Sequence, residues 1–186
     1  MRAPARWTAL VALLLASATP ARALAGDGTL DLGLTGGTST WQGDPTAGTL
    51  LRVGYRIDDW LGFHGMGRLG YASVDERALV LVGVGAQAWT TFGESQPFVR
   101  LTLVHAHEEP VDAIPGDVFG ALFGVGDGIR HRAGVEPAVG LDYRLWRDGP
   151  LDVVATAEAS FQVFPDDRGP TLYVLGGLGL GIRHDL

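Results

Sequence analysis

A short run of alternating imidazoles and a carboxylate stands out in this sequence: His105, His107 and Glu109, with His131 further along the chain. Alternate residues of a β-strand share one face. A hairpin whose paired residue numbers sum to about 236 would place His105 beside His131, with their Cβ atoms roughly 5 Å apart. Imidazoles and carboxylates bind transition metals, and carboxylates also bind Ca²⁺. The spacing therefore indicates a candidate site for a divalent cation or another ligand.

A cation or ligand site is one interpretation of these histidines and of the acids near them, and a second gives them no specific function. The nearby acids Glu108, Asp112, Asp117 and Asp127 fall in a connection, and exposed acids are common in loops. Histidines at the level of lipid headgroups can act as polar interface residues that face anionic lipopolysaccharide. In a third interpretation, the three histidines hold a metal ion that activates water for hydrolysis. The sequence leaves all three interpretations open.

Composition excludes several other kinds of chemistry. The 186 residues suffice for one domain. The chain has fourteen arginines, no lysine and no cysteine. Disulfide scaffolds, thiolate zinc sites and cysteine nucleophiles are excluded, as are a P-loop lysine and a Schiff-base lysine. The net charge of −7 argues against a nucleic-acid partner, and 46% hydrophobic residues argue against disorder.

Residues 1–25 have the pattern of a secretory signal peptide. Arg2 and Arg6 precede an apolar stretch over residues 7–18, and Ala23-Leu24-Ala25 resembles a cleavage site. The apolar stretch is too short to span a bilayer as a helix. We therefore expect an exported chain of residues 26–186, with eleven arginines against twenty-one acids and no transmembrane helix.

Eight segments of residues 26–186 alternate between apolar and polar side chains with period two, which is typical of strands with one apolar face. In residues 151–163, for example, Ala155 and Ala157 alternate with Thr156 and Glu158. Residues 78–92 are apolar on both faces, and Val80, Val82 and Val84 are assigned to the outward face there. The polar face carries charges of both signs, at Asp31, Arg52, Arg56, Arg68, Arg100, Arg130, Arg132, Glu136, Asp142, Arg144, Asp152, Glu158, Arg183 and Asp185.

The near balance of these charges indicates which face points inward. Buried guanidinium groups and carboxylates must pair, whereas a soluble barrel would turn its aliphatic side chains inward. The pattern therefore predicts an all-β, eight-stranded, antiparallel, up-and-down transmembrane barrel with a charged lumen and lipid outside.

Connections and aromatic residues fit the same arrangement. Short turns are expected at residues 58–59, 93–97 and 146–150, on the side of both termini, and longer loops at 36–48, 74–77, 108–128 and 165–170. Aromatic girdles are expected at a lower rim of Trp60, Trp89, Phe92, Phe98, Tyr143 and Trp146, and at an upper rim of Trp41, Tyr71, Phe161 and Phe164.

The last segment carries apolar residues at alternate positions, Leu178, Leu180, Ile182 and Leu186, with His184 interrupting the series. On this pattern and its strand count, the chain resembles the small eight-stranded outer-membrane barrels of Gram-negative bacteria, of the OmpA/OmpX-like kind. The resemblance implies insertion from the periplasm and no wide pore. His105-Ala106-His107 is also similar, in its first residue alone, to the His-x-Ser pair of lipid A deacylase barrels, with His107 in place of the serine nucleophile.

The function expected first is a non-enzymatic outer-membrane protein with a plugged polar lumen, whose acidic outer loops bind divalent cations, lipopolysaccharide or an envelope protein. One alternative is a membrane-embedded hydrolase of lipid A or phospholipid that uses the His/Glu group, with or without a metal. The other is a secreted soluble barrel that binds an apolar ligand. No cofactor is expected beyond a divalent cation at the histidines.

Overall fold

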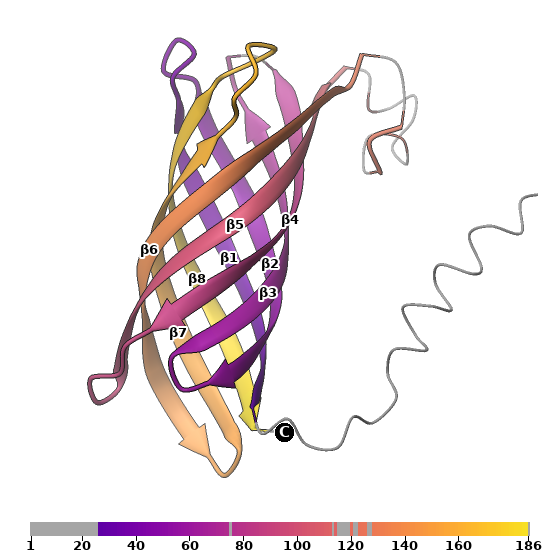
Figure 1. Ribbon diagram of the computed structural model, residues 1–186. Coiled ribbons are helices and arrows are strands. Elements are labelled where there is room, and N and C mark those ends of the chain that lie inside the picture. The colour runs from indigo at the N-terminus through magenta and orange to yellow at the C-terminus, as the bar shows by residue number, and fades with distance from the viewer. Residues whose placement is uncertain are drawn as a thin grey trace, which may run out of the picture.

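Eight antiparallel strands close into one barrel in this computed structural model, which describes residues 26–74, 76–112, 114, 120, 123–125 and 128–185. Each strand pairs with the next along the chain, and β8 pairs with β1 (Figure 1). The strands are β1 (Asp27–Ser39), β2 (Pro45–Asp58), β3 (Leu61–Ala72), β4 (Arg77–Trp89), β5 (Ser95–Pro110), β6 (Arg130–Asp148), β7 (Leu151–Val163) and β8 (Leu172–Asp185). The predicted fold class is confirmed. The signal segment, Asp117, Asp127 and Leu186 lie outside the described residues.

The connections alternate between the two ends of the barrel. The turns over residues 59–60, 90–94 and 149–150 lie at the end that holds the C-terminus (Figure 1). At the other end, the predicted loop over residues 36–48 is shorter than expected, because β1 and β2 continue pairing as far as Thr38 and Pro45. Only the connection over residues 111–129 is long. No helix among the described residues is long and apolar enough to cross a membrane.

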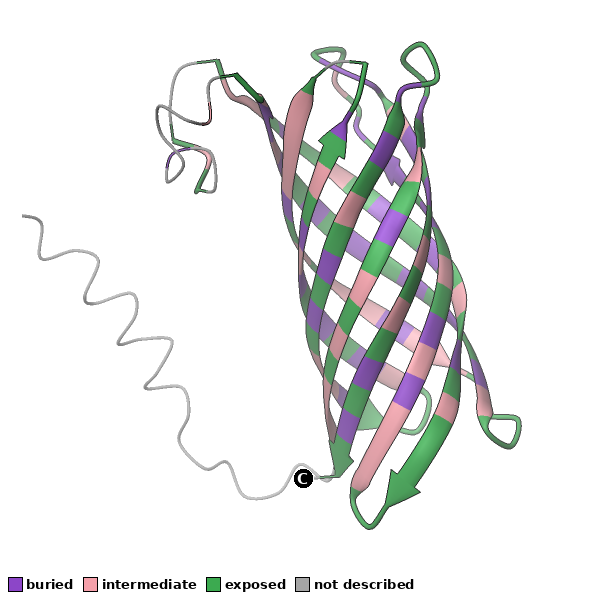
Figure 2. Cartoon of the chain, turned by 180° about the vertical axis from the view of Figure 1, so that it is seen from behind, coloured by how far each residue is buried: buried purple, intermediate pink, exposed green. Residues whose placement is uncertain are grey.

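Side chains on the outside of the barrel are predominantly apolar and exposed. Leu34 is 69% exposed and Leu178 is 70% exposed, although both lie in the middle of paired strands. Val82 and Val84 of β4 are also exposed, as predicted for that segment. Exposed and buried positions alternate along the strands, which Figure 2 shows as alternating bands. Since a strand has period two, the inward positions are the polar set.

Glycine makes room for long charged side chains on the inner wall. A Cβ atom at Gly177 would lie 3.1 Å from Cγ of Glu158. At Gly85, a Cβ atom would lie 2.9 Å from Cε1 of His64 and closer still to the neighbouring backbone. In an eight-stranded barrel the interior is only wide enough for side chains. The small residues therefore allow arginines and glutamates to cross the lumen.

Three aromatic residues assigned to the girdles in fact point into the lumen. Phe98 is 4% exposed and Phe164 is 1% exposed. The indole of Trp89 donates a hydrogen bond to the buried Asp142 (2.9 Å). The other girdle residues, Trp41, Trp60, Tyr71, Phe92, Tyr143, Trp146 and Phe161, are exposed.

The interior is not lined by charge alone. Apolar side chains form a buried cluster between the charged groups, at Leu50, Met66, Leu81, Val104, Ala106, Phe164, Tyr173 and Leu175. The sequence pattern gives no signal for this cluster, because glycines already interrupt the alternation on the inward face where its few leucines and its valine lie. The lumen thus combines ion pairs with a small apolar core.

Candidate functional site

The hairpin of β5 and β6 brings the three histidines together on the outer wall. His107 pairs directly with His131, and His105 pairs with Ala133. The register expected from the sequence, with His105 beside His131, is therefore wrong by two residues, and His105 is the diagonal neighbour. A two-residue shift keeps every side chain on its face. The three imidazoles consequently still share the outward face.

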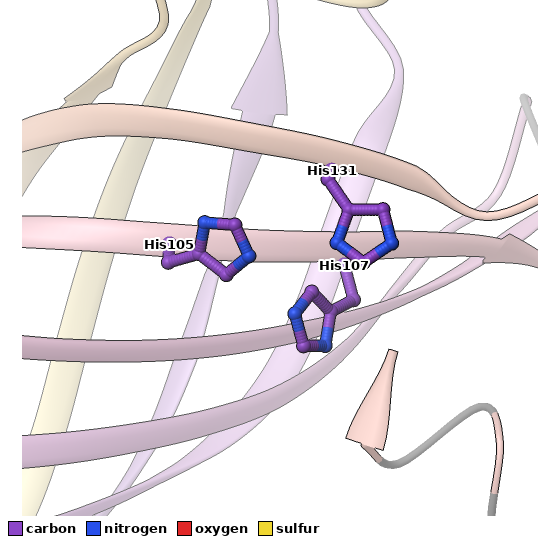
Figure 3. A group of neighbouring side chains, drawn as sticks. All are labelled: His105, His107 and His131. Carbon is purple, nitrogen blue, oxygen red and sulfur yellow. The ribbon is translucent and has the colours of Figure 1, made fainter. Parts of the chain in front are cut away.

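The imidazole rings surround a common space (Figure 3). The ring centroids of His107 and His131 are 4.9 Å apart, those of His105 and His107 are 4.8 Å apart, and those of His105 and His131 are 5.7 Å apart. One ring nitrogen from each residue lies within 4.8 Å of the others. His105 and His131 are exposed, whereas His107 is half-buried. Three neutral imidazoles in this arrangement can donate three lone pairs to one cation.

Part of the long connection packs against His107. Gly124 has φ +67°, and a Cβ atom at this position would lie 2.4 Å from Nδ1 of His107. The amide of Val125, the residue after Gly124, donates a hydrogen bond to the carbonyl of Gly120 (2.8 Å). Nδ1 of His107 is shielded from solvent and has no hydrogen-bond partner in the described part of the chain.

The neighbouring acids do not join the histidines. Among the described residues, the group of converging ligand atoms contains the three histidines and not Glu109. The side chain of Glu109 is buried. Glu108 was predicted to lie in a loop, but it belongs to β5, which continues to Pro110. Its side chain has the same parity as Arg100 and points into the lumen, where it is 1% exposed.

The likeness to a serine hydrolase site does not extend beyond His105. Ala106 lies between the two histidines of β5 and is buried on the inner face. Glu136 is also fully buried inside, where it binds Arg68 and accepts a hydrogen bond from Gln162 (2.8 Å). The barrel wall therefore separates this carboxylate from the outward-facing imidazoles.

The charged residues predicted for the lumen lie on the inner face, and the structure groups them by their partners. Near the middle, Glu158 binds Arg100 at 2.8 Å and Arg52 at 3.0 Å. Arg52 also approaches Asp31 at 3.5 Å. Arg68 holds Glu136 with two hydrogen bonds, of 2.7 Å and 3.0 Å. Two parallel bonds between a guanidinium and a carboxylate fix orientation as well as charge.

At the end nearest the termini, Asp142 is the main acceptor. It binds Arg183 and accepts hydrogen bonds from Trp89 and from Thr156 (2.7 Å). The guanidinium of Arg56 lies over the Trp89 ring, 4.8 Å from its centroid. Further out, on the rim, Arg144 and Arg147 bind Asp152 at 3.7 Å and 2.8 Å.

At the opposite end, Arg132 of β6 joins the neighbouring elements of the inner wall. It binds Glu108 at 3.0 Å and Asp166 at 2.9 Å, and its guanidinium lies 4.4 Å from the Phe164 ring centroid. Arg130 binds the same Glu108 at 3.1 Å. Desolvation opposes the ionisation of Asp166, but hydrogen bonds from Arg168 and Arg132 hold the pKa of this loop carboxyl below its usual value.

Small cavities lie between these inward-facing side chains. Three interior cavities among the described residues have volumes of about 30, 10 and 10 Å³. A single water needs about 10–15 Å³ by this measure. Each cavity therefore has room for a few water molecules at most, and for nothing as large as an apolar ligand.

No protein-family model matches the sequence, and no curated protein matches it. Solved structures do share the fold. Neisserial surface protein A is 16% identical, with a TM-score of 0.57, covering 87% of this chain and 97% of that one. Ail of Yersinia pestis, solved with the heparin analogue sucrose octasulfate, is 15% identical, with a TM-score of 0.52, covering 87% and 99%. The outer membrane protein OprG from Pseudomonas aeruginosa is 11% identical, with a TM-score of 0.50, covering 87% and 97%. The chain thus has the fold of small outer-membrane barrels, as its resemblance predicted.

Proposed function

We propose that this chain is an integral outer-membrane protein with a closed lumen and a structural or binding role at the cell envelope. The single observation that carries the proposal is the inverted arrangement of the barrel wall. Leu101 is 54% exposed on the outside, whereas its neighbours Arg100 and Thr102 are 3% and 0% exposed on the inside. The fold that the chain shares with outer-membrane barrels supports the same conclusion.

The energetics favour lipid over water around the barrel. Each apolar side chain moved out of water gains about 25 cal/mol per Å², and exposed leucines and valines recur on every strand. A water-soluble barrel would need the opposite arrangement, with these side chains in the core. A soluble carrier of an apolar ligand would also need an apolar interior, whereas this interior holds ion pairs at both ends and in the middle. We therefore set that alternative aside.

The ion pairs and the small cavities support a closed lumen. At one end of the interior, Tyr173 of β8 donates a hydrogen bond to Glu108 of β5 (3.4 Å), and at the other end Arg183 of β8 binds Asp142 of β6. To let ions through, several buried pairs would have to separate, and an unpaired buried charge costs several kcal/mol. A plug of this kind supports a role other than transport through the barrel.

The binding role is assigned to the loops at the end opposite the termini. Of their acids, Asp44 accepts hydrogen bonds from Ser73 and Val74, and Asp166 binds Arg132. These two acids stabilise the loops instead of offering free charge. The connection over residues 111–129 carries exposed apolar side chains, at Val111, Phe123 and Val125. It supplies the surface for lipopolysaccharide or an envelope protein.

The proposal is tested by refolding residues 26–186 into detergent and phospholipid vesicles. A folded membrane barrel should migrate differently on gels with and without heating, should need detergent to stay in solution, and should show no steady conductance in planar bilayers. A chain that stays soluble and monodisperse without detergent would contradict the membrane assignment. Stable channel conductance would contradict the closed lumen.

A further inference from the structure

We propose that His105, His107 and His131 bind one divalent transition-metal ion, best matched by Zn²⁺, on the outer wall of the barrel. This site lies outside the lumen network and goes beyond the role proposed above. It rests on three observations: the convergence of three imidazoles from two paired strands, the absence of a carboxylate from the group among the described residues, and the loop that packs on His107.

Backbone pairing places the ligands before any ion arrives. His105 and His107 alternate on β5, and His131 is the direct partner of His107 on β6. The ring nitrogens lie within 4.8 Å of one another. In a tetrahedral zinc site with Zn–N bonds of about 2.0–2.1 Å, the nitrogens are about 3.4 Å apart. The difference corresponds to shifts of about 1 Å per ring, which the exposed side chains of His105 and His131 can make by rotating about their own bonds.

The donor set selects the class of ion. Imidazole nitrogen suits Zn²⁺, Cu²⁺ and Ni²⁺, whereas Ca²⁺ and Mg²⁺ take oxygen ligands. Glu108 is turned into the lumen and bound by Arg130 and Arg132. This contact removes an oxygen donor that the sequence had offered for Ca²⁺. Three protein ligands also leave a fourth position for water or for an oxygen atom of a bound molecule.

The packing of the loop explains why His107 is half-buried while His105 and His131 are exposed. Gly124 lies so close to the His107 ring that a Cβ atom there would overlap it. The loop backbone shields Nδ1 of His107 without giving it a hydrogen-bond partner among the described residues. Buried polar atoms are nearly always satisfied by protein, water or an ion. The loop therefore restrains His107, while the two exposed rings close on the ion.

The test uses the refolded chain without a histidine tag, since a tag would bind the same metals. Binding of Co²⁺ is followed by its visible absorption, and Zn²⁺ is then titrated in competition. His105→Ala, His107→Ala and His131→Ala are compared with His184→Ala, which removes an exposed histidine from β8, away from the group. Gly124→Ala serves as a milder change that displaces the His107 ring. Heat-dependent gel migration of each sample reports whether the barrel is folded, independently of metal.

We expect one ion per chain, with the intense absorption bands of tetrahedral Co²⁺ in the wild-type protein and in His184→Ala. Loss of an outer partner of a metal ligand costs about 10–100-fold in affinity, so loss of a ligand should cost at least about 100-fold. Protons compete with the metal ion for the imidazole nitrogens, so affinity should also fall in acid. A wild-type barrel that is folded but shows no tetrahedral bands, or binding that is equal in the wild type and in all three alanine variants, would overturn the site. Either result would leave the membrane barrel itself standing.

Discussion

The lumen and the outer histidine group are both polar clusters built by adjacent strands, but they differ in how their members are satisfied. In the lumen, Glu136 has Arg68 and Gln162, and Glu158 has Arg52 and Arg100. On the outer wall, three imidazoles face one another with no carboxylate in their group among the described residues. A cluster that neutralises itself stabilises the fold, whereas a cluster of donors without a counter-charge is suited to an external cation.

Breaking a lumen pair should have the largest effect. Glu136→Leu leaves Arg68 in the interior without its bidentate partner, and such an uncompensated buried charge costs about 3–5 kcal/mol. Urea unfolding in vesicles, followed by tryptophan fluorescence, measures the loss. The double variant Arg68→Met/Glu136→Leu should regain most of the free energy, because it removes both charges together. If Glu136→Leu were as stable as the wild type, the lumen ion pairs would contribute no more to the unfolding free energy than exposed surface pairs do.

A charge on the outer wall should have the next largest effect. Leu180 is 59% exposed in the middle of β8. In a bilayer, Leu180→Arg should reduce the unfolding free energy by about 2–4 kcal/mol, whereas the same change near an interface costs about 0–1 kcal/mol. Ile57→Arg, near the turn that follows β2, supplies that control. Equal small effects at both positions would mean that the two sites share one polar environment.

The metal should stabilise one cluster and leave the other untouched. If the folded state alone binds Zn²⁺, an ion concentration 100 times the dissociation constant adds about 2.7 kcal/mol to the unfolding free energy. We expect this gain in the wild type and in Arg68→Met/Glu136→Leu, and its loss in His131→Ala. A gain of the same size in His131→Ala would place the ion elsewhere.

The smallest of these effects should be a loss of stability at low pH in the loop that holds Asp166. Because Asp166 has a pKa lowered from the ordinary value of 3.8, its contribution to stability is present above that pH and is lost as the pH falls through the folded-state pKa. Proteolysis of the connection over residues 164–171 by an acid-active protease should therefore accelerate at low pH. Asp166→Asn should be cleaved at the fast rate throughout the working pH range of that protease, including above the folded-state pKa, where the wild type is still protected. Cleavage of the wild type that does not change with pH would contradict this role for Asp166.

Most of the fold could be predicted from the alternation of apolar and polar residues. The positions that were predicted wrongly, Phe98 and Glu108, show where that rule was not followed far enough. The parity of Arg52, Arg100 and Glu158 assigned the inner face correctly, because a period of two leaves no third choice. Phe98 shares the parity of Arg100, so its inward position was available from the same rule. It was misassigned because aromatic residues near strand ends suggested a girdle. The same parity argument applies to Glu108, whose strand was expected to end too early.

The candidate site was harder to predict than the wall. The shared face of His105, His107 and His131 followed from spacing alone, but the register of the hairpin depends on how the connection over residues 111–129 is accommodated. Gly124 and its contact with His107 carry no sequence signal beyond a glycine in a glycine-rich chain. Partner choice in the lumen also needs three dimensions, because Arg52 and Glu158 are distant in sequence and meet across the interior.

The most direct test of the central claim is the environment of the outer wall in a bilayer. The chain has no cysteine, so single spin labels at Leu101→Cys and Leu180→Cys can be compared with one at Asp112→Cys in a loop. We expect the two wall labels to collide with oxygen far more often than with a water-soluble nickel chelate, and the loop label to show the reverse. Wall labels that collide freely with the chelate would contradict a lipid-facing surface.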